Sequence, residues 1–66
     1  MIVIVNSLKR EVPADATVQV LLETMGLTTQ RIAIEVNQEL VTKLEWGTLE
    51  LHEGDHVEIV SFVGGG

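Results

Sequence analysis

One stretch of this 66-residue chain has the spacing of an amphipathic helix, and it limits the folds that the chain can adopt. Its apolar residues recur at i, i+3, i+4 and i+7 and form a single stripe: Val18, Leu21, Leu22 and Met25. Thr17 is the expected N-cap, with Asp15 as the alternative, and Gly26 can adopt the left-handed conformation that ends a helix. We therefore predict one helix, which packs its stripe against a sheet.

Residues 1–12 have the pattern of a β-hairpin. Residues 1–5 are continuously apolar, which is typical of an inner strand that is covered on both faces, or covered on one and offered to a partner on the other. Asn6 and Ser7 supply turn chemistry, because both side chains can bond to nearby backbone groups. Residues 8–12 return as a more polar strand, whose charges suit the edge of a sheet.

The segment after the helix predicts two more strands and a helical turn. Residues 31–37 alternate between apolar and polar positions, and residues 40–41 are long enough for only a very short strand. Thr42 and Glu45 have the spacing of a capping box, which predicts a helical turn that includes Trp46. We expect this single tryptophan to plug the edge of the core rather than to bind a ligand, because its ring has a large area to bury.

Residues 56–62 predict the last strand. Val57 and Ile59 alternate with more polar positions, so we expect them to face the helix. Val60 and Phe62 then lie on the open face of the sheet, where they are available to a partner. A mixed sheet with one helix on one face is an α+β architecture.

Charge and composition exclude several classes of function. The formal net charge of −6, from ten acidic and four basic residues, argues against nucleic acid, which needs a Lys/Arg patch. The charge suits solubility or a basic protein partner. No apolar run approaches the ~20 residues of a membrane span, and the absence of cysteine is compatible with the cytoplasm.

No residue pattern predicts a metal site or a catalytic centre in the chain itself. His52 and His56 flank a Gly-Asp turn rather than lie on a helix, so we expect surface histidines and no metal ligands. The serines, Ser7 and Ser61, have no catalytic motif around them, and there is no cysteine nucleophile.

Three of the six glycines end the chain, at Gly64, Gly65 and Gly66. Glycine loses much conformational entropy on ordering and has no side chain to pack, so this triplet does not stabilise a fold. A loose terminus or a linker remnant is one interpretation. In the other, the carboxylate of Gly66 is activated as an acyl adenylate, and the side-chain-free glycines let it enter the active site of another enzyme. The tail alone leaves both interpretations open.

Seven segments from one end of the chain to the other carry a resemblance to a known family. They are Val5-Asn6, Thr17-Val18, Leu21-Leu22-Glu23, Ala33-Ile34-Glu35-Val36-Asn37, Val41 with Glu45-Trp46, Glu53-Gly54-Asp55-His56-Val57-Glu58-Ile59-Val60 and Phe62-Val63-Gly64-Gly65-Gly66. Together they resemble the ubiquitin-like β-grasp sulfur carriers of the ThiS/MoaD family, most closely the ThiS type of thiamine biosynthesis. Family members commonly end in Gly-Gly, and Gly64 takes a place where others have a small residue.

The resemblance implies a single β-grasp domain over residues 1–66, with residues 63–66 as a flexible, extended reactive tail. It implies that an E1-like (ThiF-type) enzyme uses ATP and magnesium to adenylate Gly66, and that sulfur from a persulfide enzyme then displaces AMP. The resulting thiocarboxylate passes its sulfur to thiazole synthase (ThiG-type). On this view the chain is a cytoplasmic co-substrate that binds no cofactor and is not an enzyme.

The strand pattern adds a hypothesis about how the activating enzyme binds. We expect Val60 and Phe62, with Ile2 or Ile4 beside them, to form the apolar patch that this enzyme contacts, and we count Val63 with this patch.

Three alternatives stay open at this point. The first is the sister carrier that supplies sulfur for molybdopterin, and the second is a ubiquitin-like modifier joined to lysines through Gly66. The third is a non-catalytic β-grasp interaction module, for which the terminal glycines would not matter.

Overall fold

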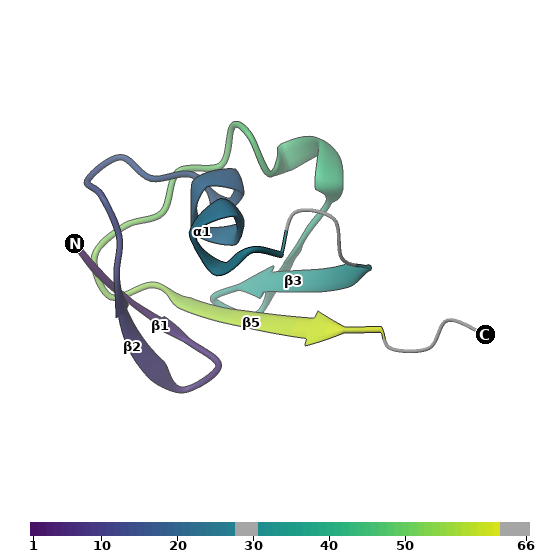
Figure 1. Cartoon of the computed structure of the whole chain (residues 1–66), viewed down its shortest axis with the longest axis horizontal. Coiled ribbons are helices and arrows are strands. Elements are labelled where there is room, and N and C mark those ends of the chain that lie inside the picture. The colour runs from purple at the N-terminus through teal and green to yellow at the C-terminus, as the bar shows by residue number, and fades with distance from the viewer. Residues whose placement is uncertain (28–30, 63–66) are drawn as a thin grey trace.

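A mixed sheet lies under one helix in the computed structural model, which describes residues 1–27 and 31–62 (Figure 1). Within these residues the sheet has five strands in the order β2-β1-β5-β3-β4. The strands are β1 (Ile2–Val5), β2 (Leu8–Glu11), β3 (Ile32–Val36), β4 (Glu39–Val41) and β5 (His56–Ser61). The helix is α1 (Val18–Met25), and a 3₁₀ turn, η1 (Lys43–Glu45), follows β4. The α+β prediction is confirmed, whereas the expected tail at residues 63–66 lies outside the described residues.

The sheet combines antiparallel and parallel pairs. β1 and β2 form the predicted hairpin, in which Asn6 (φ 48°) and Ser7 (φ 72°) both have the positive φ that a two-residue turn of matching twist requires. β5 runs parallel to β1 and antiparallel to β3, and β3 runs antiparallel to β4. β5 is therefore the central strand, and the charged β2 lies at an edge as expected.

The caps of α1 confirm the predicted helix. The Thr17 hydroxyl accepts a hydrogen bond from the Val20 N–H at 3.3 Å, so Thr17 rather than Asp15 is the N-cap. Gly26 has φ 71° and ends the helix in the left-handed conformation. Three residues of the apolar stripe are fully buried: Val18, Leu21 and Leu22.

The core lies between α1 and one face of the sheet. The sheet contributes Val3, Val5, Ile34, Val57 and Ile59, all of them buried. Trp46 follows η1 and is 5% exposed, so the prediction that it plugs the core is confirmed. Without cysteine the chain has no disulfide, and burial of these side chains supplies the main stabilisation.

The boundaries of all five strands differ from the predictions by one residue at one or both ends, and two of these differences lie at β4 and β5. β5 ends at Ser61, one residue before the expected end, although the Phe62 N–H still donates to the Arg31 carbonyl at 2.8 Å. β4 begins at Glu39, since the turn needs only two residues, Asn37 and Gln38, both with positive φ. Neither of the helices that the structure describes has the length and hydrophobicity to cross a membrane.

Candidate functional site

β5 is the central strand of the sheet and the last strand before Phe62, so the contacts that hold β5 determine where Phe62 lies. β1 pairs with β5 only as far as Val57. Beyond that point the side chain of Asn6 continues the ladder, because its Oδ1 accepts from the Ile59 N–H at 2.8 Å and its Nδ2 donates to the Ile59 carbonyl at 3.1 Å. Asn6 thus replaces one further residue of β1.

A second asparagine fixes the start of β5. The Oδ1 atom of Asn37 accepts from the His56 N–H at 3.0 Å, and its Nδ2 donates to Asp55 Oδ1 at 3.0 Å. Asp55 Oδ2 in turn accepts from the His52 N–H at 2.7 Å, which closes the turn before the strand. The sequence indicated turn chemistry at Asn6 and the end of a strand at Asn37, but it did not indicate the hydrogen bonds of either side chain to distant residues.

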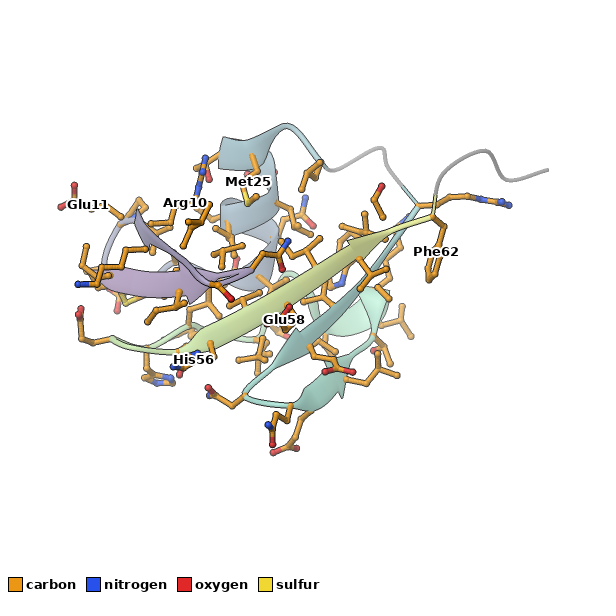
Figure 2. All side chains as sticks on the ribbon, turned by 90° about the horizontal axis from the view of Figure 1, so that it is seen from below. Arg10, Glu11, Met25, His56, Glu58 and Phe62 are labelled. Carbon is orange, nitrogen blue, oxygen red and sulfur yellow. The ribbon has the colours of Figure 1, made fainter. Side chains whose placement is uncertain are left out.

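The two faces of β5 differ as predicted. Val57 and Ile59 are 1% and 9% exposed and face the helix. Val60 and Phe62 are 54% and 57% exposed. Seen from below the sheet, Glu58 lies midway along β5 and Phe62 lies at its far end (Figure 2).

The expectation that Ile2 or Ile4 lies beside Val60 and Phe62 is wrong. In the parallel pair Ile4 lies opposite His56, four residues before Val60, which corresponds to about 13 Å along a strand. Ile2 lies still farther back. The neighbour of Val60 is instead Ala33 of β3. Val63 lies outside the described residues, and Val60 and Phe62 remain as the exposed apolar residues at this end of the strand.

Acidic residues occupy the middle of the open face. Glu35 of β3 and Glu58 of β5 are directly opposite each other and both are exposed. Like charges at opposed positions destabilise a sheet, so this pair does not contribute to the stability of the fold. The open face therefore has an acidic middle and an apolar end, a pattern that suits a partner with a basic and an apolar contact.

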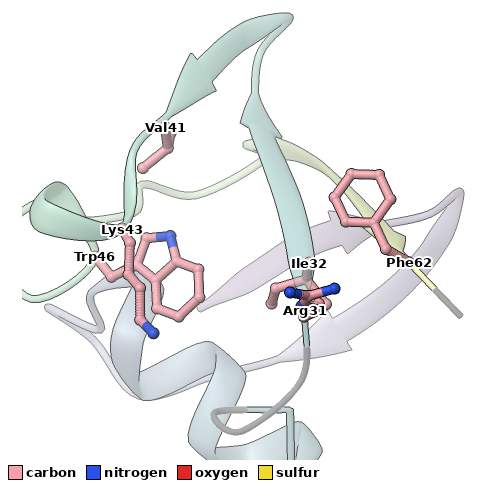
Figure 3. A pocket seen from close by; sticks show the side chains of 6 residues that line it. All are labelled: Arg31, Ile32, Val41, Lys43, Trp46 and Phe62. Carbon is pink, nitrogen blue, oxygen red and sulfur yellow. The ribbon is translucent and has the colours of Figure 1, made fainter. Parts of the chain in front are cut away.

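A groove of about 360 Å³ lies beside Phe62 (Figure 3). Its walls come from three separate parts of the chain: Arg31, Ile32, Val41, Lys43, Trp46 and Phe62. This groove has no local signal in the sequence, because no periodic pattern relates residues so far apart along the chain.

Ionisable side chains elsewhere have structural roles. Glu45 Oε1 accepts from both the backbone N–H and the hydroxyl of Thr42 at 2.9 Å, as the capping-box spacing predicted. The bond from the backbone N–H, followed by that from the hydroxyl, lowers the pKa of Glu45. Among the residues that the structure describes, no three His, Asp or Glu side chains are arranged to hold a metal ion.

Comparisons with known proteins agree on one family. The model of the ThiS family matches residues 3–66. A protein of Bacillus subtilis named sulfur carrier protein ThiS is 40% identical over 50 residues, which are 76% of each chain. The crystal structure of a thiamine biosynthesis protein (ThiS) from Geobacter metallireducens superimposes with a TM-score of 0.83 at 26% identity, and all of both chains is covered.

Another relative is much longer than this chain. A protein of Paramagnetospirillum magneticum named thiazole synthase is 36% identical over 66 residues, which are 100% of this chain but 20% of that protein. This chain thus spans about a fifth of the length of that curated relative.

Proposed function

This chain belongs to the ThiS family, and on that premise we propose that it is a sulfur carrier of thiamine biosynthesis whose reactive group is the carboxylate of Gly66. The main support for this proposal is the family match over residues 3–66, a range that includes the terminal glycines. The fold agrees with it, because the ThiS crystal structure superimposes over the whole chain.

The chemistry proceeds in four steps. A carboxylate oxygen of Gly66 attacks the α-phosphate of ATP on an E1-like enzyme, pyrophosphate leaves, and magnesium on that enzyme balances the phosphate charge. The terminal sulfur of a persulfide then attacks the acyl carbon, AMP leaves, and an acyl disulfide forms. A second thiol of the sulfur-donating partner attacks the partner's sulfur in this S–S bond, so the partner is left with a disulfide and the chain with a thiocarboxylate. The sulfur of the thiocarboxylate is transferred to thiazole synthase. In this scheme the protein is consumed and regenerated as a co-substrate, while its partners catalyse.

Glycine at the last three positions suits this chemistry for a steric reason. Without a Cβ, the backbone can adopt conformations closed to other residues and can enter a narrow channel. We assign Gly66 as the reacting residue and Gly64 and Gly65 as the segment that passes through the channel. Val60 and Phe62, both more than half exposed, are proposed to contact the activating enzyme.

The partners follow from the same scheme: an adenylating enzyme, a persulfide enzyme and a thiazole synthase, all placed in the cytoplasm. The relatives named thiazole synthase support the last of these. A region similar to this chain makes up 20% of one such protein and 16% of another. A carrier-like segment therefore lies within each of these two polypeptides that are named thiazole synthase. A carrier tethered to its acceptor gains a high effective concentration, which is consistent with two proteins that work in sequence.

The test is adenylation followed by identification of the acceptor. We expect pyrophosphate release by the adenylating enzyme to depend on this chain, and we expect a variant that ends at Gly64 to give none while it keeps the same fold. With a persulfide source and thiazole synthase, we expect sulfur in the thiazole product. Sulfur in molybdopterin, or an isopeptide bond to lysine, would assign the chain to another branch of the family's chemistry, and activity of the shortened variant would contradict the proposal.

A further inference from the structure

The groove beside Phe62 is basic, in contrast to the net charge of the whole chain. Two of the four basic residues of the chain, Arg31 and Lys43, line it. Among the described residues that line it none is acidic, although the whole chain has ten acidic residues and a net charge of −6. Charge complementarity therefore favours an acidic occupant in this groove.

The indole of Trp46 adds a buried donor to the groove. Its Nε1 atom is buried and has no hydrogen-bond acceptor among the described residues, and the side chain is 5% exposed. A buried donor without an acceptor is less stable than a bonded one, so the molecule gains when an acceptor reaches this atom. Figure 3 shows the indole nitrogen on the ring edge that is turned toward Val41, within the lining of the groove.

Lys43 places its charge over the face of the Trp46 ring. Its Nζ atom lies 5.7 Å from the centroid of the Trp46 ring, a cation–π distance, and the residue is exposed. An exposed lysine side chain has free rotamers, so it can turn from the ring to a carboxylate of a partner. The remaining walls are apolar: Ile32, Val41 and Phe62.

The size of the groove limits what fits. A volume of about 360 Å³ holds one or two side chains of an extended segment. It is too narrow for a helix, whose diameter with side chains is about 10–12 Å. An acidic side chain with an apolar neighbour matches both the cations and the apolar walls.

We propose that this groove binds an acidic side chain and its apolar neighbour on an extended segment of the adenylating enzyme. Arg31 and Lys43 donate charge-assisted hydrogen bonds to the carboxylate, and Trp46 Nε1 donates to the same segment. Phe62 is both a wall of the groove and the last described residue before the glycines, so an enzyme that takes the tail has the groove within reach. The inference rests on the proposed function, because it requires a partner that activates the tail.

The test follows the indole resonance and the binding constant together. Trp46 is the only tryptophan, so the ¹⁵N-labelled chain gives a single indole N–H signal that unlabelled adenylating enzyme does not obscure. We expect this signal to move downfield in the complex as the N–H gains an acceptor. We expect the double variant Arg31→Gln/Lys43→Gln to bind the adenylating enzyme about tenfold or more weakly, because each substitution removes a charge that faces the partner's carboxylate.

A matched control removes the same charge elsewhere. Lys9 and Arg10 lie on β2, at the opposite edge of the sheet from β4, and are exposed. We expect Lys9→Gln/Arg10→Gln to bind the enzyme as the wild-type chain does. Both double variants change only exposed side chains, so the amide spectrum of each should keep the dispersion of the folded protein.

Wild-type affinity of the Arg31→Gln/Lys43→Gln variant, equal losses in both double variants, or an indole signal that stays in place in a saturated complex would overturn the proposal. So would an indole shift caused by thiazole synthase and not by the adenylating enzyme. Failure of the proposed function is distinguishable, because then the wild-type chain itself would give no adenylate and no complex, and both proposals would fall.

Discussion

The two faces of β5 belong to the same strand yet are built for different purposes. On one face Val57 and Ile59 are buried under α1 and pack in the core. On the other face Glu58, Val60 and, just beyond the strand, Phe62 are exposed, and two of these three are large apolar residues. Exposed apolar residues at the end of the central strand do not stabilise the monomer. Side chains alternate between the two faces of the strand, so one face can stabilise the fold while the other binds a partner. Substitutions can therefore change stability or recognition separately.

The largest expected effect comes from one valine on each face. Val57→Ala should lower the free energy of unfolding by about 2 kcal/mol, since it leaves a cavity in a tightly packed core. Val60→Ala makes the same chemical change at an exposed position and should stay within about 0.5 kcal/mol. Urea unfolding of both variants measures the difference, and an equal loss of unfolding free energy in the two variants would contradict the distinction between the faces.

The next effect concerns recognition. Phe62→Asp places a charge on the exposed apolar end of β5, and we expect the KM for the carrier in adenylation to rise about tenfold, which is about 1.4 kcal/mol. The free energy of unfolding should hardly change, because Phe62 is 57% exposed. Steady-state pyrophosphate release measures the KM, and unchanged kinetics would remove Phe62 from the interface. Leu8→Asp, at an exposed leucine on β2, serves as the control.

A smaller effect should appear at the acidic middle of the open face. Glu58→Gln removes the repulsion from Glu35, which lies directly opposite, so we expect the variant to be more stable by a few tenths to about 1 kcal/mol. The gain should shrink as salt is added, because exposed charges are screened. Glu11→Gln is the matched control, since its cross-strand partner is Ile2. A loss of stability in Glu58→Gln would mean that this carboxylate supports the fold.

The smallest effect lies outside both faces, in the turn after β4. The hydrogen bonds from Thr42 lower the pKa of Glu45 in the folded protein. These bonds therefore stabilise the fold fully at pH values above the Glu45 pKa of the unfolded chain. The stabilisation is lost as the pH falls through the Glu45 pKa of the folded protein. Thr42→Ala should raise this pKa only partly, because the larger contribution comes from the backbone N–H. An NMR titration of the Glu45 carboxyl carbon measures it. Thr48→Ala should leave it unchanged, since the Thr48 hydroxyl donates to the Glu45 backbone.

The elements that were predictable from sequence are those with local causes. The α1 stripe with its caps at Thr17 and Gly26 needs only neighbouring residues, and so does the alternation that buries Val57 and exposes Val60. The register between β1 and β5 has no local cause. It depends on contacts between distant segments, including the bonds from Asn6 to Ile59, and for that reason Ile2 and Ile4 were placed at the wrong end of the strand.

The groove was unpredictable for a related reason. Trp46 was expected in the core, and it is there, but the sequence could not place it across from Phe62. The unbonded Nε1 atom follows from the packing around the ring and not from any motif. Long-range assembly therefore determines the part of the surface with the most specific chemistry.

Tandem mass spectrometry determines whether sulfur is added to the chain and whether Gly66 receives it. The intact chain is incubated with the adenylating enzyme, ATP and a persulfide source, and its mass is compared with that of the untreated protein. The account predicts a gain equal to the replacement of one oxygen atom by sulfur, located in the fragment that ends at Gly66. An unchanged mass in the presence of active partners, or sulfur on any other residue, would contradict it.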